Sequence, residues 1–186
     1  MAAKELAMFR TEAVFIDRDG TIGEPGEMEY PSEFRAFSTV YADIGRLKAL
    51  GIKAFAFTNQ VCIARDKLAG HDFGKEFSEY GFDDWFICPH ELHENCRCKK
   101  PGIGMLIKAM KKYDLDLSSC WVIGDRLTDI YAGKKAGCRT ILVLTGWGKH
   151  YESGPERDFP DHIAQDFNQA VDLIINSEQV DQISDG

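Results

Sequence analysis

The sequence predicts a three-layer α/β domain in which helices cover both faces of a doubly wound parallel sheet. Short apolar runs alternate with helix-like segments along the chain, and these runs are almost continuously hydrophobic. Strands that are buried on both faces have this pattern, and β–α alternation favours a parallel sheet. The expected strands cover residues 13–17, 52–58, 85–88, 120–124 and 140–144.

Helix-like segments fill the intervals between these strands. We expect helices over residues 39–50, 102–113, 127–136 and 166–176, with a short helical region between residues 61 and 99. Gly51 and Gly137 follow two of them, where a helix commonly ends in a left-handed glycine. The 186 residues suit one core. We therefore expect a single domain over residues 1–186, with residues 177–186 as a flexible tail.

Composition and charge exclude several classes of protein. The chain is 44% hydrophobic, which excludes intrinsic disorder, and its formal net charge is -8. A net anion binds nucleic acid or an acidic membrane surface poorly. No apolar run approaches the roughly 20 residues that a bilayer span needs, and the first ten residues lack a secretory signal. We expect a cytoplasmic protein with no membrane or nucleic-acid partner, and a monomer by default.

Polar side chains follow the expected strands at the point where each strand ends. They are Asp17 and Asp19 after the first strand, Thr58, Asn59 and Gln60 after the second, and Asp125 and Asp129 after the fourth. In open α/β sheets, ligands bind beyond the carboxyl ends of the strands. One cleft is therefore expected to collect these side chains.

The carboxylates indicate a magnesium site. Asp17 and Asp19 are two residues apart, so their side chains leave a strand on the same side. Together with Asp125 and Asp129 they would repel one another without a hard cation such as Mg²⁺. Lys100 and Thr58 would add a positive charge and a hydroxyl group. Taken singly, these residues also suit a turn, a helix cap or a solvated loop, but their combined order favours phosphoryl transfer through an aspartate nucleophile.

A cluster of cysteines indicates a second metal. Four zinc-type ligands fall within 11 residues: Cys88, His90, Cys96 and Cys98. Tetrahedral Cys₃His is a common structural zinc set, although the one-residue spacings are tighter than in most zinc fingers. The alternatives are a cluster of free cysteines and ligation by His93. A structural Zn²⁺ would hold the loop of residues 88–98 that precedes Lys100.

Four motifs appear in the order found in the haloacid dehalogenase (HAD) superfamily of phosphatases. They are VFIDRDGT at residues 14–21, TNQ at 58–60, KP at 100–101 and GDRLTD at 124–129. Residues 13–146 resemble that superfamily, which implies its Rossmann-like sheet and an aspartyl-phosphate mechanism. By this resemblance Asp17 is the nucleophile and Asp19 the general acid/base. Mg²⁺ would be held by Asp17, the Asp19 carbonyl and Asp125, with Asp129 supporting the metal shell. Thr58 and Lys100 would bind the phosphoryl group.

Within the superfamily the sequence resembles the subgroup of heptose bisphosphate and histidinol phosphate phosphatases. Residues 63–65 (IAR) and 104–105 (GM) are similar to the heptose enzymes, whereas the short loop between His90 and Cys96 resembles the histidinol enzymes. The resemblance implies a small phosphorylated metabolite of carbohydrate metabolism, with a heptose 1,7-bisphosphate first and histidinol phosphate second. A nucleic-acid 3′-phosphatase and a non-catalytic zinc-containing binding module are further alternatives.

No segment has room for a separate cap domain. Neither residues 22–57 nor residues 61–99 could hold, besides their expected elements, a domain of about 50 residues. We therefore expect a capless enzyme with a small flap at residues 22–37. The expected substrate contacts are Arg18, Asn59, Gln60, Arg65, Lys99 and Arg126. Lys99 replaces the arginine usual in the resembled enzymes, and lysine cannot make the bidentate fork of arginine.

Overall fold

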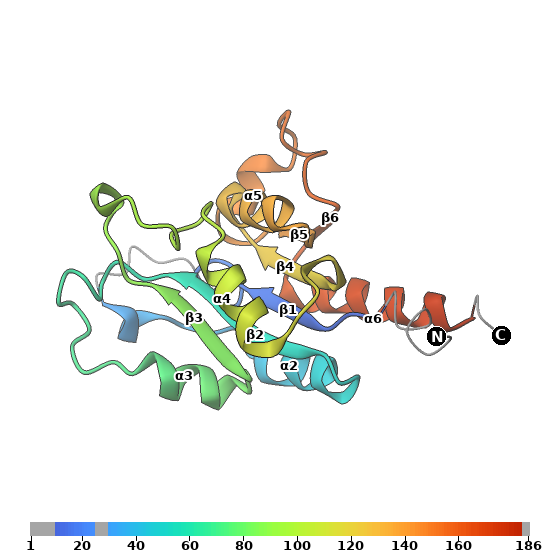
Figure 1. The fold of residues 1–186 in the computed structure, drawn as a ribbon, viewed down its shortest axis with the longest axis horizontal. Coiled ribbons are helices and arrows are strands. Elements are labelled where there is room, and N and C mark those ends of the chain that lie inside the picture. Colours follow the sequence, from blue (N-terminus) through green and yellow to red (C-terminus); the bar gives the residue numbers. More distant parts are fainter. Residues whose placement is uncertain (1–9, 25–29, 184–186) are drawn as a thin grey trace.

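The computed structural model describes residues 10–24 and 30–183, and a six-stranded parallel sheet forms its centre (Figure 1). The strand order is β3-β2-β1-β4-β5-β6, and each neighbouring pair is parallel. The strands are β1 (Ala13–Ile16), β2 (Lys53–Asn59), β3 (Asp84–Cys88), β4 (Cys120–Gly124), β5 (Arg139–Val143) and β6 (His162–Ala164). The predicted doubly wound sheet is confirmed, and its five expected strands are present within one residue of their expected ends. The three-residue β6 was not expected, because so short a segment carries no periodic pattern.

Helices cover both faces of the sheet, as predicted. They are α2 (Val40–Ala49), α3 (Phe73–Tyr80), α4 (Gly104–Tyr113), α5 (Leu127–Ala136) and α6 (Phe167–Ile183). Short 3₁₀ turns are η1 (Pro31–Glu33), η2 (Leu92–Glu94), η3 (Leu117–Ser119) and η4 (Gly146–Tyr151). Helices α2, α3 and α6 pack into one hydrophobic cluster with the sheet, and α4 and α5 pack into the other (Figure 1).

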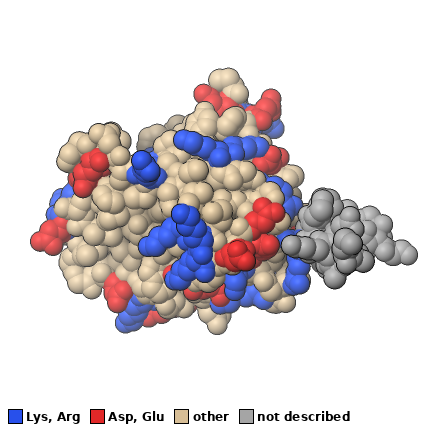
Figure 2. Space-filling view, viewed as in Figure 1, with Lys and Arg blue, Asp and Glu red and all other residues tan. Residues whose placement is uncertain are grey.

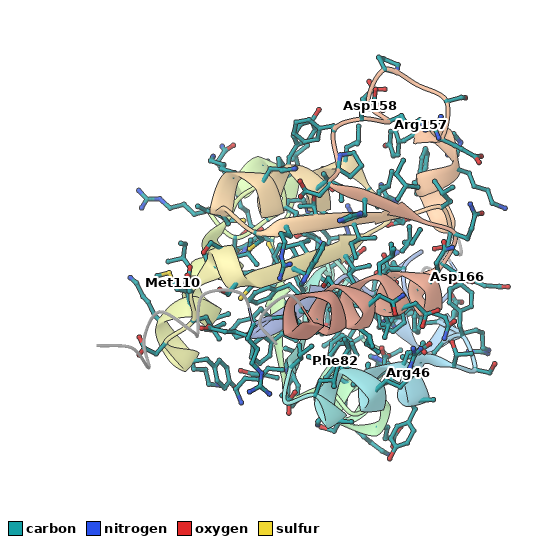
Figure 3. The ribbon with its side chains drawn as sticks, turned by 90° about the vertical axis from the view of Figure 1, so that its right-hand side faces the viewer. Arg46, Phe82, Met110, Arg157, Asp158 and Asp166 are labelled. Carbon is teal, nitrogen blue, oxygen red and sulfur yellow. The ribbon has the colours of Figure 1, made fainter. Side chains whose placement is uncertain are left out.

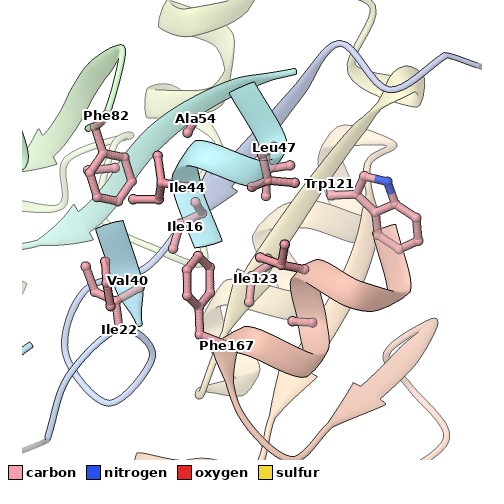
Figure 4. Packing of buried hydrophobic residues seen from close by; sticks show 14 of the residues in the cluster. Ile16, Ile22, Val40, Ile44, Leu47, Ala54, Phe82, Trp121, Ile123 and Phe167 are labelled. Carbon is pink, nitrogen blue, oxygen red and sulfur yellow. The ribbon is translucent and has the colours of Figure 1, made fainter. Parts of the chain in front are cut away.

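The alternation of side chains along β1 explains the two clusters. Val14 and Ile16 enter the cluster beneath α2 and α6, whereas Ala13 and Phe15 enter the cluster beneath α4 and α5. All four side chains are fully buried, which is why the sequence of this strand is continuously apolar. Figure 4 shows the first cluster, in which Phe167 of α6 lies beside side chains of the sheet and of α2. Strand β1 is thereby fixed in the middle of the molecule, with its carboxyl end at the edge where the polar residues gather.

Helix α3 is the short helical region expected after β2. Its first turn is capped by Asp72, whose side chain accepts a hydrogen bond from the backbone N–H of Lys75 at 3.1 Å. It ends at Gly81, whose φ of 92° suits glycine. Phe73 and Phe77 face the core, and Glu76 lies between them in the same buried stripe.

Helix α6 is longer than the sequence analysis expected. It continues from Phe167 to Ile183 instead of ending at residue 176, so most of the expected tail of residues 177–186 is helical. Glu178 is buried, and its carboxylate accepts a hydrogen bond from the backbone N–H of Thr11 at 3.0 Å. Figure 3 looks onto this helix, with Arg46 of α2 nearby, and Arg46 forms an ion pair with Asp172 of α6. Residues 184–186 lie outside the described residues.

The described residues contain no second folded unit, in agreement with the capless prediction. Between β1 and α2 they form a loop with the turn η1, and between β2 and β3 they form α3 and its connections. Part of the expected flap, residues 25–29, lies outside the described residues, while Gly23 pairs with Asp19 and Ala36 through isolated bridges. In the part of the chain that is described, no helix is both long and apolar enough to cross a membrane. Acidic and basic side chains are interspersed over the face shown in Figure 2.

Candidate active site

The polar residues that follow the strands meet in one cavity at the carboxyl edge of the sheet. The cavity has a volume of about 460 Å³. Among the residues predicted to form the site, those that line it are Asp17, Asp19, Asn59, Lys99, Lys100, Arg126 and Asp129. Residues from four different strand ends or loops therefore converge there, as the rule for ligand sites in α/β sheets requires.

Lys100 joins two carboxylates at the bottom of this cavity. Its ammonium nitrogen, Nζ, lies 2.7 Å from Asp17 Oδ1 and 2.6 Å from Asp129 Oδ1, and it donates to the carbonyl of Phe57 at 2.7 Å. The side chain is only 3% exposed. Burial alone would lower the pKa of Lys100, but the carboxylates of Asp129 and Asp17 outweigh it and raise the pKa to about 12. Lys100 is therefore a fixed positive charge beside the predicted nucleophile.

Asp125 occupies a cradle built by two glycines. A Cβ atom on Gly20 would lie 2.1 Å from Asp125 Oδ2, and one on Gly146 would lie 2.2 Å from the same oxygen. Oδ2 accepts a hydrogen bond from the backbone N–H of Trp147 at 2.8 Å. The other oxygen, Oδ1, is buried without a hydrogen-bond partner among the described residues. Such an orphaned oxygen fits a cation ligand.

The electrostatics of the carboxylates also fit Mg²⁺. Ligand oxygens of Asp17, Asp125 and Asp129 lie within 4.8 Å of one another. Burial first, and then the charges of Asp17 and Asp129, raise the pKa of Asp125 to about 8, so a divalent cation would replace a proton there. Both oxygens of Asp129 are already engaged, one by Lys100 and the other by the backbone N–H of Arg126 at 3.0 Å. These two contacts agree with the expectation that Asp129 supports the metal shell.

The predicted acid/base, Asp19, is held from the TNQ motif. Its Oδ2 accepts a hydrogen bond from Gln60 Nε2 at 2.6 Å, and the same nitrogen donates to the Thr58 hydroxyl at 2.9 Å. Asn59 Oδ1 accepts from the backbone N–H of Lys100 at 3.1 Å. Desolvation raises the pKa of Asp19 in spite of the nearby Arg18 charge. Gln60 and Thr58 thus lie beneath the cavity, where they organise it instead of lining it.

Besides Gln60, two further expected substrate contacts lie outside the cavity lining. The Arg18 side chain is 1% exposed, and its guanidinium group is bonded to Glu76, Asp19 and the carbonyl of Pro31. Arg65 is exposed and forms an ion pair with Glu91. Neither lines the cavity, because protein acceptors already hold both guanidinium groups.

Lys99 and Arg126 do line the cavity, as expected of substrate contacts. Lys99 Nζ donates to the carbonyl of His90 at 3.1 Å, and the Arg126 guanidinium lies 5.0 Å from the centre of the Trp147 ring. Trp147 therefore reaches the site twice, through this contact and through its backbone N–H on Asp125.

Sequence reasoning missed Glu76. This residue lies between Phe73 and Phe77 on the apolar stripe of α3, and it is only 9% exposed. A carboxylate inside an apolar helical stripe needs a partner, since an unpaired buried charge is costly. That pattern in the sequence could have indicated a buried cation opposite it. His71 also reaches this carboxylate, with Nε2 at 2.8 Å from Glu76 Oε2.

The predicted zinc ligands form a compact cluster next to the active-site loop. The three sulfur–sulfur distances among Cys88, Cys96 and Cys98 are 3.3, 3.4 and 3.6 Å, and His90 Nδ1 lies 3.2 and 3.5 Å from two of the sulfurs. A Zn–S bond of about 2.3 Å in a tetrahedron gives sulfur–sulfur edges of roughly 3.8 Å. The cluster is therefore close to the size and composition of a Cys₃His zinc site.

The chemistry of the thiols supports a cation in the cluster. Burial raises the pKa of Cys88 to about 12, whereas the backbone N–H of Lys99 and the neighbouring thiols outweigh desolvation and lower the pKa of Cys96 to about 7. A cation held by the cluster would displace the thiol protons, because the thiolate is the form of cysteine that binds zinc. His93 lies outside the group, while Cys120 and Cys138 are buried in the core. The loop is tied to Lys99, whose backbone N–H lies 3.4 Å from Cys96 Sγ.

Comparison with known proteins identifies relatives with the same architecture. A HAD-hydrolase-like family model matches residues 97–170. D-glycero-alpha-D-manno-heptose-1,7-bisphosphate 7-phosphatase of Photorhabdus laumondii is 34% identical over 155 residues, which cover 74% of this chain and 85% of the relative. The corresponding beta-heptose enzyme of Haemophilus ducreyi is 29% identical over 181 residues, which cover 88% of this chain and 96% of the relative.

Solved structures agree with these relatives. D,D-heptose 1,7-bisphosphate phosphatase from B. bronchiseptica, complexed with magnesium and phosphate, superimposes with a TM-score of 0.78 at 26% identity, over 89% of this chain and 98% of that one. A HAD-like phosphatase from Mesorhizobium loti gives a TM-score of 0.69 at 26% identity, over 92% of this chain and 88% of that one. With its four motifs, its parallel sheet and these relatives, the chain belongs to the haloacid dehalogenase superfamily of phosphatases.

Proposed function

We propose that the protein is a Mg²⁺-dependent phosphatase that removes the 7-phosphate from a D-glycero-D-manno-heptose 1,7-bisphosphate. One observation carries the proposal: Asp17 lies against Lys100 at the base of a cavity that two further cations, Lys99 and Arg126, also line. A single phosphate needs only the group at the base, whereas a bisphosphate gives the outer cations an anion to bind. The curated relatives are named for this substrate.

The reaction begins at Asp17. A carboxylate oxygen of Asp17 attacks the phosphorus, so an Asp17–phosphate bond forms while the bond from phosphorus to the sugar oxygen breaks. The Lys100 ammonium, 2.7 Å from Asp17, offsets negative charge on the transferring oxygens. Thr58, whose hydroxyl accepts a hydrogen bond from Gln60, lies behind the residues that line the cavity and supports the phosphoryl site from there.

Asp19 moves the protons. In the first half of the reaction its carboxyl group gives a proton to the departing sugar oxygen, so the leaving group departs as an alcohol. In the second half the Asp19 carboxylate takes a proton from water, the water oxygen bonds to phosphorus, and Asp17 is released. The raised pKa of Asp19 favours the protonated form that the first half requires.

Asp17, the Asp19 carbonyl oxygen and Asp125 would hold Mg²⁺, with Asp129 behind them. When bound, the ion supplies a Lewis acid that polarises the phosphoryl oxygens. Cys88, His90, Cys96 and Cys98 would hold a structural Zn²⁺. Four protein ligands leave no open position for substrate, so this site would fix the loop that carries Lys99 and Lys100.

The proposal is tested with a panel of phosphorylated metabolites in the presence of Mg²⁺, with released phosphate as the readout. The panel contains both anomers of the heptose bisphosphate, histidinol phosphate and a 3′-phosphorylated oligonucleotide. The wild-type protein should turn over a heptose bisphosphate fastest, and Asp17→Asn should abolish turnover in a protein that still folds, because Lys100 keeps its ion pair with Asp129. Faster turnover of histidinol phosphate would overturn the substrate assignment. Equal activity of Asp17→Asn and wild type would overturn the mechanism.

A further inference from the structure

Arg18 lies between the proposed nucleophile and the proposed acid/base, yet it is buried in the protein. Four donor contacts hold its guanidinium group. Nε and Nη2 donate to the two carboxylate oxygens of Glu76 at 2.7 and 2.8 Å, and Nη2 also donates to the carbonyl of Pro31 at 2.9 Å. Nη1 donates to Asp19 Oδ1 at 2.7 Å. Because four contacts engage a planar group that has five N–H donors, the guanidinium has little freedom to rotate.

Packing fixes the plane of the guanidinium as well as its edges. Its central carbon lies 3.8 Å from the centre of the Phe34 ring and 5.3 Å from that of Phe73. Glu76 and Phe73 both come from α3, a helix that begins more than 50 residues after Arg18. The bidentate pair with Glu76 has the geometry in which arginine and a carboxylate bind most strongly. Helix α3 therefore holds Arg18 in one orientation.

Asp19 is less constrained than Arg18. Its side chain is 32% exposed and faces the cavity, so packing alone does not select one orientation. The contacts that select it are Arg18 Nη1 on one oxygen and Gln60 Nε2 on the other. Each carboxyl oxygen offers two acceptor positions, so both contacts leave a position for a proton directed into the cavity.

We propose that Arg18, anchored by Glu76, is a positioning residue that holds the Asp19 carboxyl group in the orientation for proton exchange with the leaving oxygen. This inference rests on the proposed function, because it takes Asp19 as the acid/base. It assigns α3 a part in the reaction although this helix supplies no group that touches the substrate. It also replaces the substrate contact that the sequence indicated for Arg18.

The test compares two leaving groups. Departure of 4-nitrophenolate from 4-nitrophenyl phosphate needs no proton, whereas departure of a sugar alkoxide does, so the ratio of the two kcat/KM values reports acid catalysis by Asp19. The quantity kcat/KM is used because it covers only the steps up to the departure of the leaving group. The variants are Glu76→Gln, which removes the anchor without touching Asp19, and Arg18→Lys, which keeps a charge but not the fork. Asp43→Asn is the matched control, since Asp43 is a buried carboxylate in α2 that bonds Arg46 and Asn168.

Glu76→Gln and Arg18→Lys should each lower kcat/KM for the sugar phosphate by about 10- to 100-fold, and for 4-nitrophenyl phosphate by less than about threefold. Asp43→Asn should change both values by the same factor. A Glu76→Gln protein that does not fold is replaced by Glu76→Asp, which keeps the charge and withdraws the carboxylate by one methylene. Equal losses on both substrates in folded Glu76 or Arg18 variants would overturn the inference.

The variant Asp19→Asn distinguishes a failure of the positioning proposal from a failure of the proposed function. If it shows the difference between leaving groups and the Glu76 and Arg18 variants do not, Asp19 is the acid and the positioning proposal fails. If Asp19→Asn itself lacks that difference, the proposed function has the wrong acid.

Discussion

Lys100→Met is the substitution whose effect follows most directly from the structure. Methionine keeps the length and apolar stem of the side chain but removes the ammonium group. In the folded protein that group lies 2.7 Å from Asp17 and 2.6 Å from Asp129, with a side chain only 3% exposed. The variant therefore leaves two buried carboxylates, with Asp125 beside them, and no compensating charge from lysine.

The expected loss of stability is large for a single residue. Removing one partner of a buried ion pair destabilises a protein by about 3–5 kcal/mol. The carboxylates can take up protons, since burial already raises the pKa of Asp129 to about 6 and that of Asp125 to about 8. The lower end, about 3 kcal/mol, is therefore expected at pH 7. For a chain of this size, that corresponds to a decrease in melting temperature of roughly 6–12 °C.

The assay is thermal unfolding at pH 7, with and without Mg²⁺, for Lys100→Met and a matched control. Lys112→Met is that control: Lys112 Nζ also lies 2.7 Å from a carboxylate, that of Asp84, but its side chain is 56% exposed. An exposed pair contributes little because solvent screens it, so this variant should melt close to the wild-type temperature. Mg²⁺ should recover part of the loss in Lys100→Met, because the cation offsets the same carboxylates.

Activity gives the second measurement on the same variant. Removing a preorganised group that offsets charge in the transition state lowers kcat by about 100- to 1000-fold, and Lys100→Met should fall in that range. If Lys100→Met melts at the wild-type temperature, or keeps more than about a tenth of wild-type activity, then Lys100 is neither the buried counter-ion nor the phosphoryl-binding charge inferred above.

Three further predictions concern the zinc cluster, the glycine cradle and the sheet edge. Cys96→Ser should lower bound zinc, measured by elemental analysis, together with melting temperature and activity, whereas Cys62→Ser should retain one Zn²⁺ per chain; full activity in zinc-free protein would contradict a structural role. Gly20→Ala and Gly70→Ala both place alanine at φ near 80°, which costs about 1–2 kcal/mol, but only at Gly20 would the new Cβ contact the Asp125 carboxylate that is proposed to bind Mg²⁺. Titration calorimetry should therefore show weaker Mg²⁺ binding in the Gly20 variant alone, and equal affinities would refute the cradle. For Asp161, desolvation is outweighed by its bonds to a lysine and a threonine, so its pKa lies below the unfolded value. Its contribution is present above about pH 4 and is lost as the pH falls through the lowered pKa. Urea unfolding should thus show Asp161→Asn less stable than wild type at pH 7, and a difference that does not shrink as the pH falls below about 4 would contradict this.

Much of the fold could be predicted from the sequence because its patterns are local. A strand buried on both faces must be apolar at successive positions, so β1 and β4 are recognisable without coordinates. In parallel strands the carboxyl ends share one edge, and this places Asp17 and Asp125 together once the strands are assigned. The Cys/His cluster is predictable for the same reason, since its four members lie within 11 residues.

Contacts between distant segments could not be predicted in this way. Arg18 looked available for substrate because it lies between the two proposed catalytic residues in the sequence, but the fold places Glu76, 58 residues later, against it. The pairing depends on how α3 packs on the sheet, which no local pattern specifies. Strand β6 and the last turns of α6 are similar cases, since tertiary partners such as Thr11 stabilise them. The sequence by itself determined the parallel sheet and placed the residues of the proposed chemistry at the carboxyl ends of its strands. Only the tertiary structure decided which charged side chains face the cavity and which are buried behind it, because burial of a charge depends on partners that come from elsewhere in the chain.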